Sequence, residues 1–306
     1  MNFSGHVPLL KEVAVLSDLI FSLILIAAAA GAAFGVTIRF CRSRSEATRN
    51  LTALTAMVLG GVYFSFLWDQ SVLARMVPTS GMIVLGNWFP VFASILAGAV
   101  WSGRHGILRR AFPTLLLGVV SAGALIAPLI GDKPVCGENW RGDICLQTTP
   151  YTCSPASAAT LLRVHGIDAT EREMAELCLT HRGTTWMGLF RGLSRKVAGS
   201  PWKVEVFDMP VGGEASPPET PAILVARLPE NSSDRELRET SGWLPGQAHS
   251  VVYLGNLTDD LLIVGDPTVG RELWRRHELR TLWTGRGLRL VARDATTTDS
   301  LLAAQQ

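Results

Sequence analysis

Four long stretches without a charged side chain lie within the first 135 residues, and they constrain the fold more than any other feature of the sequence. A helix needs roughly 20 apolar residues to cross a bilayer, and helices of soluble cores are rarely this long and this free of charge. The sequence therefore predicts a transmembrane domain over residues 1–135, with spans at about 19–38, 51–68, 81–101 and 111–131. The uncharged stretches themselves are Leu19–Ile38, Leu51–Trp68, Met76–Gly103 and Ala111–Gly131.

The positive charges between the predicted spans are distributed unequally. Seven arginines follow the first and third stretches, whereas the N-terminal tail and the loop after the second stretch offer Lys11 and Arg75. Lysine and arginine collect on the cytoplasmic side, so we expect the N-terminus and everything after Gly131 to lie outside the cytoplasm. A cleaved signal peptide is the alternative for the first stretch, but a signal peptide has its positive charge before the apolar run. Here four arginines follow the run, an order that favours an uncleaved span. The seven are Arg39, Arg42, Arg44, Arg49, Arg104, Arg109 and Arg110.

Residues 136–306 have the mixed composition of a soluble domain, and about 170 residues are enough to bury a core. The net charge of the whole chain is only +2, too small for a surface that binds a polyanion, so we expect no nucleic-acid partner. Cys136 and Cys145 flank a short polar loop at the start of this domain. In an oxidising compartment they could form a disulfide, and they could equally stay free thiols.

Helical patterns come first in the soluble domain and strand patterns follow, which predicts an α+β fold. We expect two long surface loops, Val211–Pro221 and Pro229–Gly246, because both are rich in turn-forming residues. The predicted helices are Cys153–His165, Thr170–Leu179 and Trp186–Lys196. The predicted strands are Lys203–Phe207, Ala222–Arg227, Ser250–Leu254, Leu261–Gly265, Arg271–Trp274 and Gly287–Val291.

Cys153 stands at the beginning of the first predicted helix of this domain. A helix N-terminus favours the thiolate, which is the nucleophilic form of cysteine; a buried core cysteine is the structural alternative. A cysteine nucleophile needs a base. His165 lies twelve residues along the same helix, about 18 Å away, and His181 and His277 lie among charged residues and look solvated. His249 immediately precedes an apolar strand, so we expect His249 to be the base.

Asp266 ends the strand that follows the one beginning after His249. If the two strands form a hairpin with Leu257 and Thr258 at its tip, His249 lies directly opposite Asp266, with Cβ atoms about 5 Å apart. A carboxylate there can orient the imidazole toward the thiol, although a His–Asp surface pair would have the same pattern. Gln147, six residues before Cys153, can donate an amide N–H to the oxyanion of a tetrahedral intermediate.

The segment LQTTPYTCSPASAATLLRVHGI resembles the active-site segment of the bacteriocin-processing peptidases, a papain-like family (cysteine-peptidase family thirty-nine) that cleaves after double-glycine leaders. That family has a glutamine, a cysteine six residues later, a small residue, a proline and an alanine-rich helix. HRGTTWMGLFRGLSRK resembles its glycine-threonine helix entry, and HSVVYLGN with LLIVGDPTVGRELW resembles its histidine and Asp-Pro strands. LWTGRGLRLV is similar to its closing strand. The matching positions are Gln147, Cys153, Pro155, Ala156, His249, Asp266, Trp283 and Gly285.

The resemblance implies a papain-like peptidase domain over 136–306, with N-terminal helices packed on an antiparallel sheet, behind a four-helix transmembrane bundle. It implies a Cys153–His249–Asp266 triad with Gln147 in the oxyanion hole, a peptide or protein substrate, and no metal or cofactor. Glycine-rich processing sites are the cleavage sites it suggests. Thr152–Cys153–Ser154 departs from the family's usual Asp-Cys-Gly. The sequence also shows no ATP-binding module, and in the family's exporters the peptidase is cytoplasmic.

Three hypotheses for function remain at this point. The first is a membrane-anchored cysteine peptidase. The second is an acyl- or amidotransferase, such as a transglutaminase-like cross-linker, which needs the same thioester and differs only in the acceptor. The third is a catalytically inactive peptide-binding module whose membrane domain carries the function.

Overall fold

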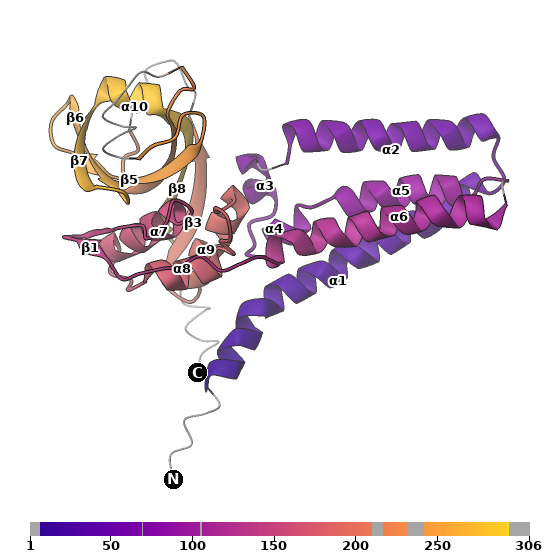
Figure 1. Ribbon diagram of the computed structural model, residues 1–306, viewed down its shortest axis with the longest axis horizontal. Coiled ribbons are helices and arrows are strands. Elements are labelled where there is room, and N and C mark those ends of the chain that lie inside the picture. Colours follow the sequence, from indigo (N-terminus) through magenta and orange to yellow (C-terminus); the bar gives the residue numbers. More distant parts are fainter. Residues whose placement is uncertain (1–6, 69, 105, 210–216, 232–241, 294–306) are drawn as a thin grey trace, which may run out of the picture. The chain divides into compact units, whose positions relative to one another are not determined.

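The computed structural model describes residues 7–68, 70–104, 106–209, 217–231 and 242–293. The chain forms two compact units, Met1–Gly131 and Asp132–Gln306, which are coloured indigo to magenta and magenta to yellow in Figure 1. Residues 210–216 and 232–241, the larger part of the two predicted surface loops, lie outside the described residues.

The first unit is helical, and α5 is its centre because it packs against α1, α2 and α6. Three helical segments are long and apolar enough to cross a membrane: Ser17–Cys41, Met82–Trp101 and Ile107–Leu129. They correspond to the first, third and fourth predicted spans. The elements are α1 (Val7–Cys41), α2 (Glu46–Phe66), α3 (Ser71–Met76), α4 (Met82–Leu85), α5 (Phe89–Trp101), α6 (Ile107–Ile126) and the 3₁₀ turn η1 (Ala127–Leu129).

The second predicted span, 51–68, is not among the segments that are long and apolar enough to cross a membrane. The helix there, α2, begins at Glu46 because the Ser45 side chain caps it by accepting a hydrogen bond from the Thr48 amide at 3.2 Å. Its first turns therefore contain Glu46, Arg49 and Asn50, and charged groups at bilayer depth are costly. The described residues thus give three candidate spans, where the sequence analysis expected four.

The third predicted stretch is not one continuous helix, because α4 ends at Leu85 and α5 begins at Phe89. Its membrane-length segment, Met82–Trp101, agrees with the predicted span at about 81–101. Asn87 lies in the break between α4 and α5, where its side chain accepts a hydrogen bond from the Phe89 amide at 3.3 Å and donates one to the Ala124 carbonyl of α6 at 2.9 Å. These bonds satisfy the amide of Asn87, and its donation to Ala124 fixes the break against α6.

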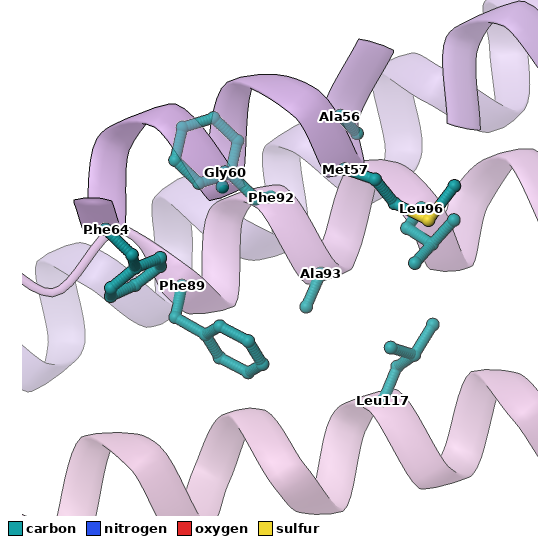
Figure 2. A pocket seen from close by; sticks show the side chains of 10 residues that line it. Ala56, Met57, Gly60, Phe64, Phe89, Phe92, Ala93, Leu96 and Leu117 are labelled. Atoms are coloured by element: carbon teal, nitrogen blue, oxygen red, sulfur yellow. The ribbon is translucent and has the colours of Figure 1, made fainter. Parts of the chain in front are cut away.

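A small apolar pocket of about 240 Å³ lies among α2, α5 and α6 (Figure 2). Small residues of α2 face the aromatic rings of α5, and a Cβ atom at Gly60 would already touch the Phe92 ring. Small residues let membrane helices approach closely, so this pocket belongs to the packing of the bundle. Its lining is Ala56, Met57, Gly60, Gly61, Phe64, Phe89, Phe92, Ala93, Leu96 and Leu117.

The second unit is α+β, as the order of the sequence patterns predicted, and its main sheet is antiparallel. Six strands pair in the order β3-β8-β4-β5-β6-β7, and β1 and β2 form a separate two-stranded ladder. Helix α7 packs against β4, β5 and β6 and against α8 and α9, which places the three helices together beside the curved sheet (Figure 1). The strands are β1 (Trp140–Arg141), β2 (Ile144–Cys145), β3 (Trp202–Asp208), β4 (Ala222–Arg227), β5 (Ala248–Asn256), β6 (Leu261–Asp266), β7 (Gly270–Arg275) and β8 (Trp283–Ala292).

Local signals explain where the helices of this unit begin and end. Thr170 and Thr185 cap α8 and α9, each accepting a hydrogen bond from the amide three residues later at 3.1 and 3.0 Å. Gly166, with φ of +72°, follows α7 in a conformation that favours glycine. The helices are α7 (Cys153–Val164), α8 (Glu171–Leu177), α9 (Trp186–Lys196) and α10 (Arg276–Leu282). The sequence analysis missed α10, whose charged residues masked its buried Leu279 and Leu282.

The predicted register of the β5–β6 hairpin is wrong by two residues. Val252 pairs with Gly265 and Tyr253 with Val264, and a bulge at Leu254 then shifts the ladder. Continued to the end of β6, this register places Asp266 opposite Val251, two residues along β5 from His249. Diagonal neighbours on one face remain within reach of long side chains, so the two residues can still meet.

Candidate active site

Cys153 is the first residue of α7 and is only partly exposed. The turn before it is closed by hydrogen bonds between Thr149 and the fully buried Thr152, including Thr152 N–H to the Thr149 carbonyl at 3.1 Å. The thiol therefore has a fixed place at a helix N-terminus, where the helix dipole favours its ionised form.

His249 and Asp266 are hydrogen-bonded in spite of the shifted register. The imidazole Nε2 and the Asp266 Oδ1 are 2.9 Å apart, the His249 side chain is 13% exposed and the Asp266 side chain is completely buried. Cys153 and His249 line the same small pocket, and each shifts the pKa of the other. Since Nε2 is engaged with the carboxylate, Nδ1 is the nitrogen that remains for the sulfur.

Trp243 completes the surroundings of the carboxylate, and the sequence analysis missed it. Its indole Nε1 donates to Asp266 Oδ2 at 2.8 Å, and its ring lies 4.6 Å from the His249 ring. The Thr268 amide donates to Oδ1 at 2.7 Å. Trp243 was counted within the predicted surface loop Pro229–Gly246, but it is 3% exposed and part of the core. A lone tryptophan in a stretch of turn-forming residues was the signal that could have revealed it.

The three groups shift one another's pKa values in the direction of an ion pair. Burial raises the pKa of Cys153, but the hydrogen bond and charge of His249 outweigh burial, and the net pKa is below the ordinary thiol value. Burial lowers the pKa of His249, whereas Asp266 and Cys153 raise it to about 10. Burial likewise raises the pKa of Asp266, and the hydrogen bond from His249 brings it below its usual value. All three shifts favour the charged forms, a thiolate, an imidazolium and a carboxylate.

Gln147 lines the same small pocket as Cys153 and His249, a space of about 50 Å³. Its backbone N–H donates to the Pro267 carbonyl at 2.7 Å, which ties the segment before the cysteine to the residue after Asp266. The side-chain Oε1 is buried without a hydrogen-bond partner. The structure thus brings together all four residues that the sequence analysis selected.

Glu171 holds the segment that carries Gln147, and the sequence analysis assigned it no role. Its carboxylate is 1% exposed and accepts three hydrogen bonds: from the Thr148 amide at 2.7 Å, the Thr148 hydroxyl at 2.5 Å and the Gly137 amide at 2.9 Å. Removing one partner from such a buried set is costly. Glu171 is therefore a structural support one residue away from Gln147.

The remaining histidines are not part of this cluster. His165 hydrogen-bonds through Nδ1 to the Leu161 carbonyl at 2.9 Å and packs edge-on against Trp202. His277 is exposed on α10, as expected, whereas His181 is half-buried and not solvated. Among the residues that the structure describes, no group of three His, Cys, Asp or Glu side chains has the arrangement of a metal site.

The other cysteines differ from Cys153 in their environment. Cys136 and Cys145 are free, buried thiols in this structure, so the disulfide that the sequence left open is not formed. Burial raises the pKa of Cys136, and burial raises the pKa of Cys145 to about 12. Cys178 is 1% exposed behind α9, and burial raises its pKa to about 12 as well.

No family model matches the chain. A protein of Methanothermobacter thermautotrophicus, named only as uncharacterized, is 44% identical over 54 residues, 17% of this chain and 38% of that protein. A protein of Methanothermobacter marburgensis with the same description is 38% identical over 76 residues, 24% of this chain and 54% of that protein. The chain thus spans about half or less of the length of these two relatives.

Among solved structures, the chain is similar to peptidase domains of transporters. The peptidase domain of Streptococcus ComA, a bifunctional ABC transporter of a quorum-sensing pathway, has 19% identity and a TM-score of 0.36, covering 49% of this chain and 98% of that domain. A double-glycine-motif protease from an AMS/PCAT transporter, in complex with the leader peptide, has 14% identity and a TM-score of 0.36, covering 49% and 91%. At these values the likeness carries no conclusion about activity, which has to come from the site.

Proposed function

We propose that the second unit is a cysteine peptidase that cleaves peptide bonds with a Cys153–His249–Asp266 triad. The observation that supports this most strongly is that Cys153, at the N-terminus of α7, lines one pocket with an imidazole that is hydrogen-bonded to the buried Asp266. Nucleophile, base and orienting group are the three parts that covalent acyl transfer needs.

In the proposed mechanism the Cys153 thiolate attacks the carbonyl carbon of the scissile peptide bond. The oxyanion that forms accepts hydrogen bonds from the Gln147 side-chain amide and from a backbone N–H at the start of α7. His249 then gives its proton to the leaving amine, and the C–N bond breaks to leave a thioester on Cys153. His249 next removes a proton from water, the resulting hydroxide attacks the thioester, and the thiolate leaves. Asp266 keeps the imidazole in the orientation required for both transfers.

The pocket beside Cys153 supports a substrate with small side chains at the cleavage site. Its volume of about 50 Å³ is bounded by Pro150, Trp243 and Leu244, and it leaves little room next to the thiol. We propose that glycine-rich processing sites, such as those of leader peptides, are the substrates.

We also propose that the apolar helices anchor this peptidase in a membrane as a multi-pass domain, in which α2 crosses the bilayer together with the three candidate spans. Four crossings place the N-terminus and the peptidase on the same side, outside the cytoplasm. The support is the excess of arginines around the α1–α2 and α5–α6 connections, both in the loops and in the adjoining helix ends. Alkaline phosphatase fused after Gln306 should be active, and a fluorescent protein that folds only in the cytoplasm should be dark. The opposite pair of results overturns the orientation.

A cleavage assay on the full-length protein in nanodiscs tests the chemistry. Fluorogenic peptides with glycine at the cleaved bond should be hydrolysed, Cys153→Ala should abolish cleavage, and Cys178→Ala, a matched change of a buried cysteine, should not. Gln147→Ala should lower turnover by about 10²–10³ if one oxyanion hydrogen bond is lost. If products are amidated only when an amine is added, the transferase hypothesis replaces the peptidase. If a thiol-reactive peptide does not label Cys153, the hypothesis of an inactive binding module replaces the peptidase.

A further inference from the structure

Two buried serine hydroxyls connect the helix of the nucleophile to the strand of the histidine. Ser154 follows Cys153 in α7, and Ser250 follows His249 in β5. Their Oγ atoms are 2.8 Å apart, although 96 positions separate them in the sequence. Both residues are buried, at 7% and 5% exposure. A hydroxyl pair therefore lies directly behind the two residues that have to meet.

A third serine fixes the backbone on the same side. Ser157 lies one turn further along α7 and its Oγ donates to the Ser250 carbonyl at 2.9 Å. Residues three apart share a helix face, so Ser154 and Ser157 hold Ser250 at its side chain and at its carbonyl. The Ser154–Ser250 contact lies next to Cys153 and His249, whereas the Ser157 contact lies one turn further along α7 and attaches the helix to the backbone of β5.

The Ser154 hydroxyl also lies near the sulfur, with Oγ 4.0 Å from Cys153 Sγ. A serine hydroxyl has one proton to donate and two lone pairs that accept. If Ser250 donates to Ser154, the Ser154 proton is left for the sulfur, which accepts it best as a thiolate. Burial raises the pKa of Cys153 and His249 lowers it, and the Ser250 backbone and the Ser154 hydroxyl lower it further.

We infer that Ser154 and Ser250 are positioning residues of the active site, which hold Cys153 against His249 and direct a hydroxyl proton toward the sulfur. This inference rests on the proposed function. The charged groups that face Cys153 are His249 of β5 and, behind it, Asp266 of β6.

The test is the pH dependence with which iodoacetamide alkylates Cys153 in the full-length protein, followed by mass spectrometry of the Cys153 peptide. Ser154→Ala should raise the midpoint by about one pH unit, which is what losing one hydrogen bond to a charged group implies. Ser250→Ala should raise it in the same direction. The double variant should be no further shifted than Ser154→Ala, because both changes interrupt one chain of hydroxyls.

Ser157→Ala is the matched control, because it removes a buried hydroxyl from the same helix face without approaching the sulfur. It should lower the unfolding temperature and leave the alkylation midpoint in place. Ser250→Thr keeps a hydroxyl in the strand and should keep the wild-type midpoint, so the pair Ser250→Ala and Ser250→Thr decides the question even if Ser154→Ala does not fold.

Two negative results have separate meanings. This inference is overturned if the Ser154 and Ser250 variants keep the wild-type midpoint, or if Ser157→Ala shifts it equally. In both cases Cys153 of the wild type still ionises at low pH, so the proposed function stands. A wild-type Cys153 that ionises like an ordinary thiol overturns the proposed function itself.

Discussion

Replacing Trp243 by phenylalanine should disturb the proposed triad through Asp266. The change removes the indole N–H that donates to Oδ2 at 2.8 Å and keeps an aromatic ring beside His249. A hydrogen bond to a charged group contributes roughly 1.5–3 kcal/mol, and one pKa unit corresponds to about 1.4 kcal/mol. The pKa of Asp266 should therefore rise by about one to two units, and the imidazolium that it stabilises should become correspondingly less stable.

The assay is the pH profile of kcat/KM for peptide cleavage. The wild type should lose activity as pH rises through about 10, the pKa of His249, and in Trp243→Phe this limb should move down by about one unit. Trp274→Phe is the matched control, because Trp274 is also a core tryptophan but donates to Glu272 at 3.0 Å. If both variants lose only stability and keep the alkaline limb, Trp243 is a packing residue and the reasoning is refuted.

Three further outcomes follow from the same contacts. Glu171→Gln should lower the free energy of unfolding by about 2 kcal/mol in urea titrations, because an amide cannot accept all three buried hydrogen bonds; unchanged stability would contradict this. The His249 pKa is raised on folding, so the stability contributed by its ion pair should be complete below pH about 6.5 and lost as pH rises through about 10. Urea titrations across that range should show this loss in the wild type and not in His249→Ala. Mass spectrometry should show that iodoacetamide leaves Cys178 unmodified at pH 7 in native protein, because burial raises the pKa of this thiol. Rapid modification would show that the Cys178 thiol is accessible to solvent.

The sequence predicts the second unit well where local signals decide. Helical patterns locate α8 and α9 to within three residues, and apolar runs locate all six strands of the sheet. Helix α10 was missed because its charged residues hide its two buried leucines. The β5–β6 register was wrong because the hairpin turns between Asn256 and Leu262, later in the chain than the expected tip at Leu257 and Thr258. The bulge at Leu254 recovers one of the three residues of this error, and periodicity reports neither feature.

The candidate site could be predicted as a set of residues but not as an assembled network. Cys153, His249, Asp266 and Gln147 have local signatures at helix starts, strand ends and turns. Glu171 and Ser250 have none, since each acts through a partner that is distant in the chain, and Trp243 has only the weak signal of a lone tryptophan among turn-forming residues. The membrane unit shows the same limit, because uncharged length alone did not reveal that α2 begins with a charged turn.

The rate of Cys153 alkylation as a function of pH, with and without His249, tests the central claim most directly. The full-length protein is treated with iodoacetamide between pH 4 and pH 10, and the Cys153 and Cys178 peptides are quantified. Wild-type Cys153 should react fast well below the free thiol pKa of about 8.5, His249→Ala should move its midpoint up toward that value, and Cys178 should stay slow throughout. A Cys153 that reacts no faster than Cys178, and is unaffected by His249→Ala, contradicts the account.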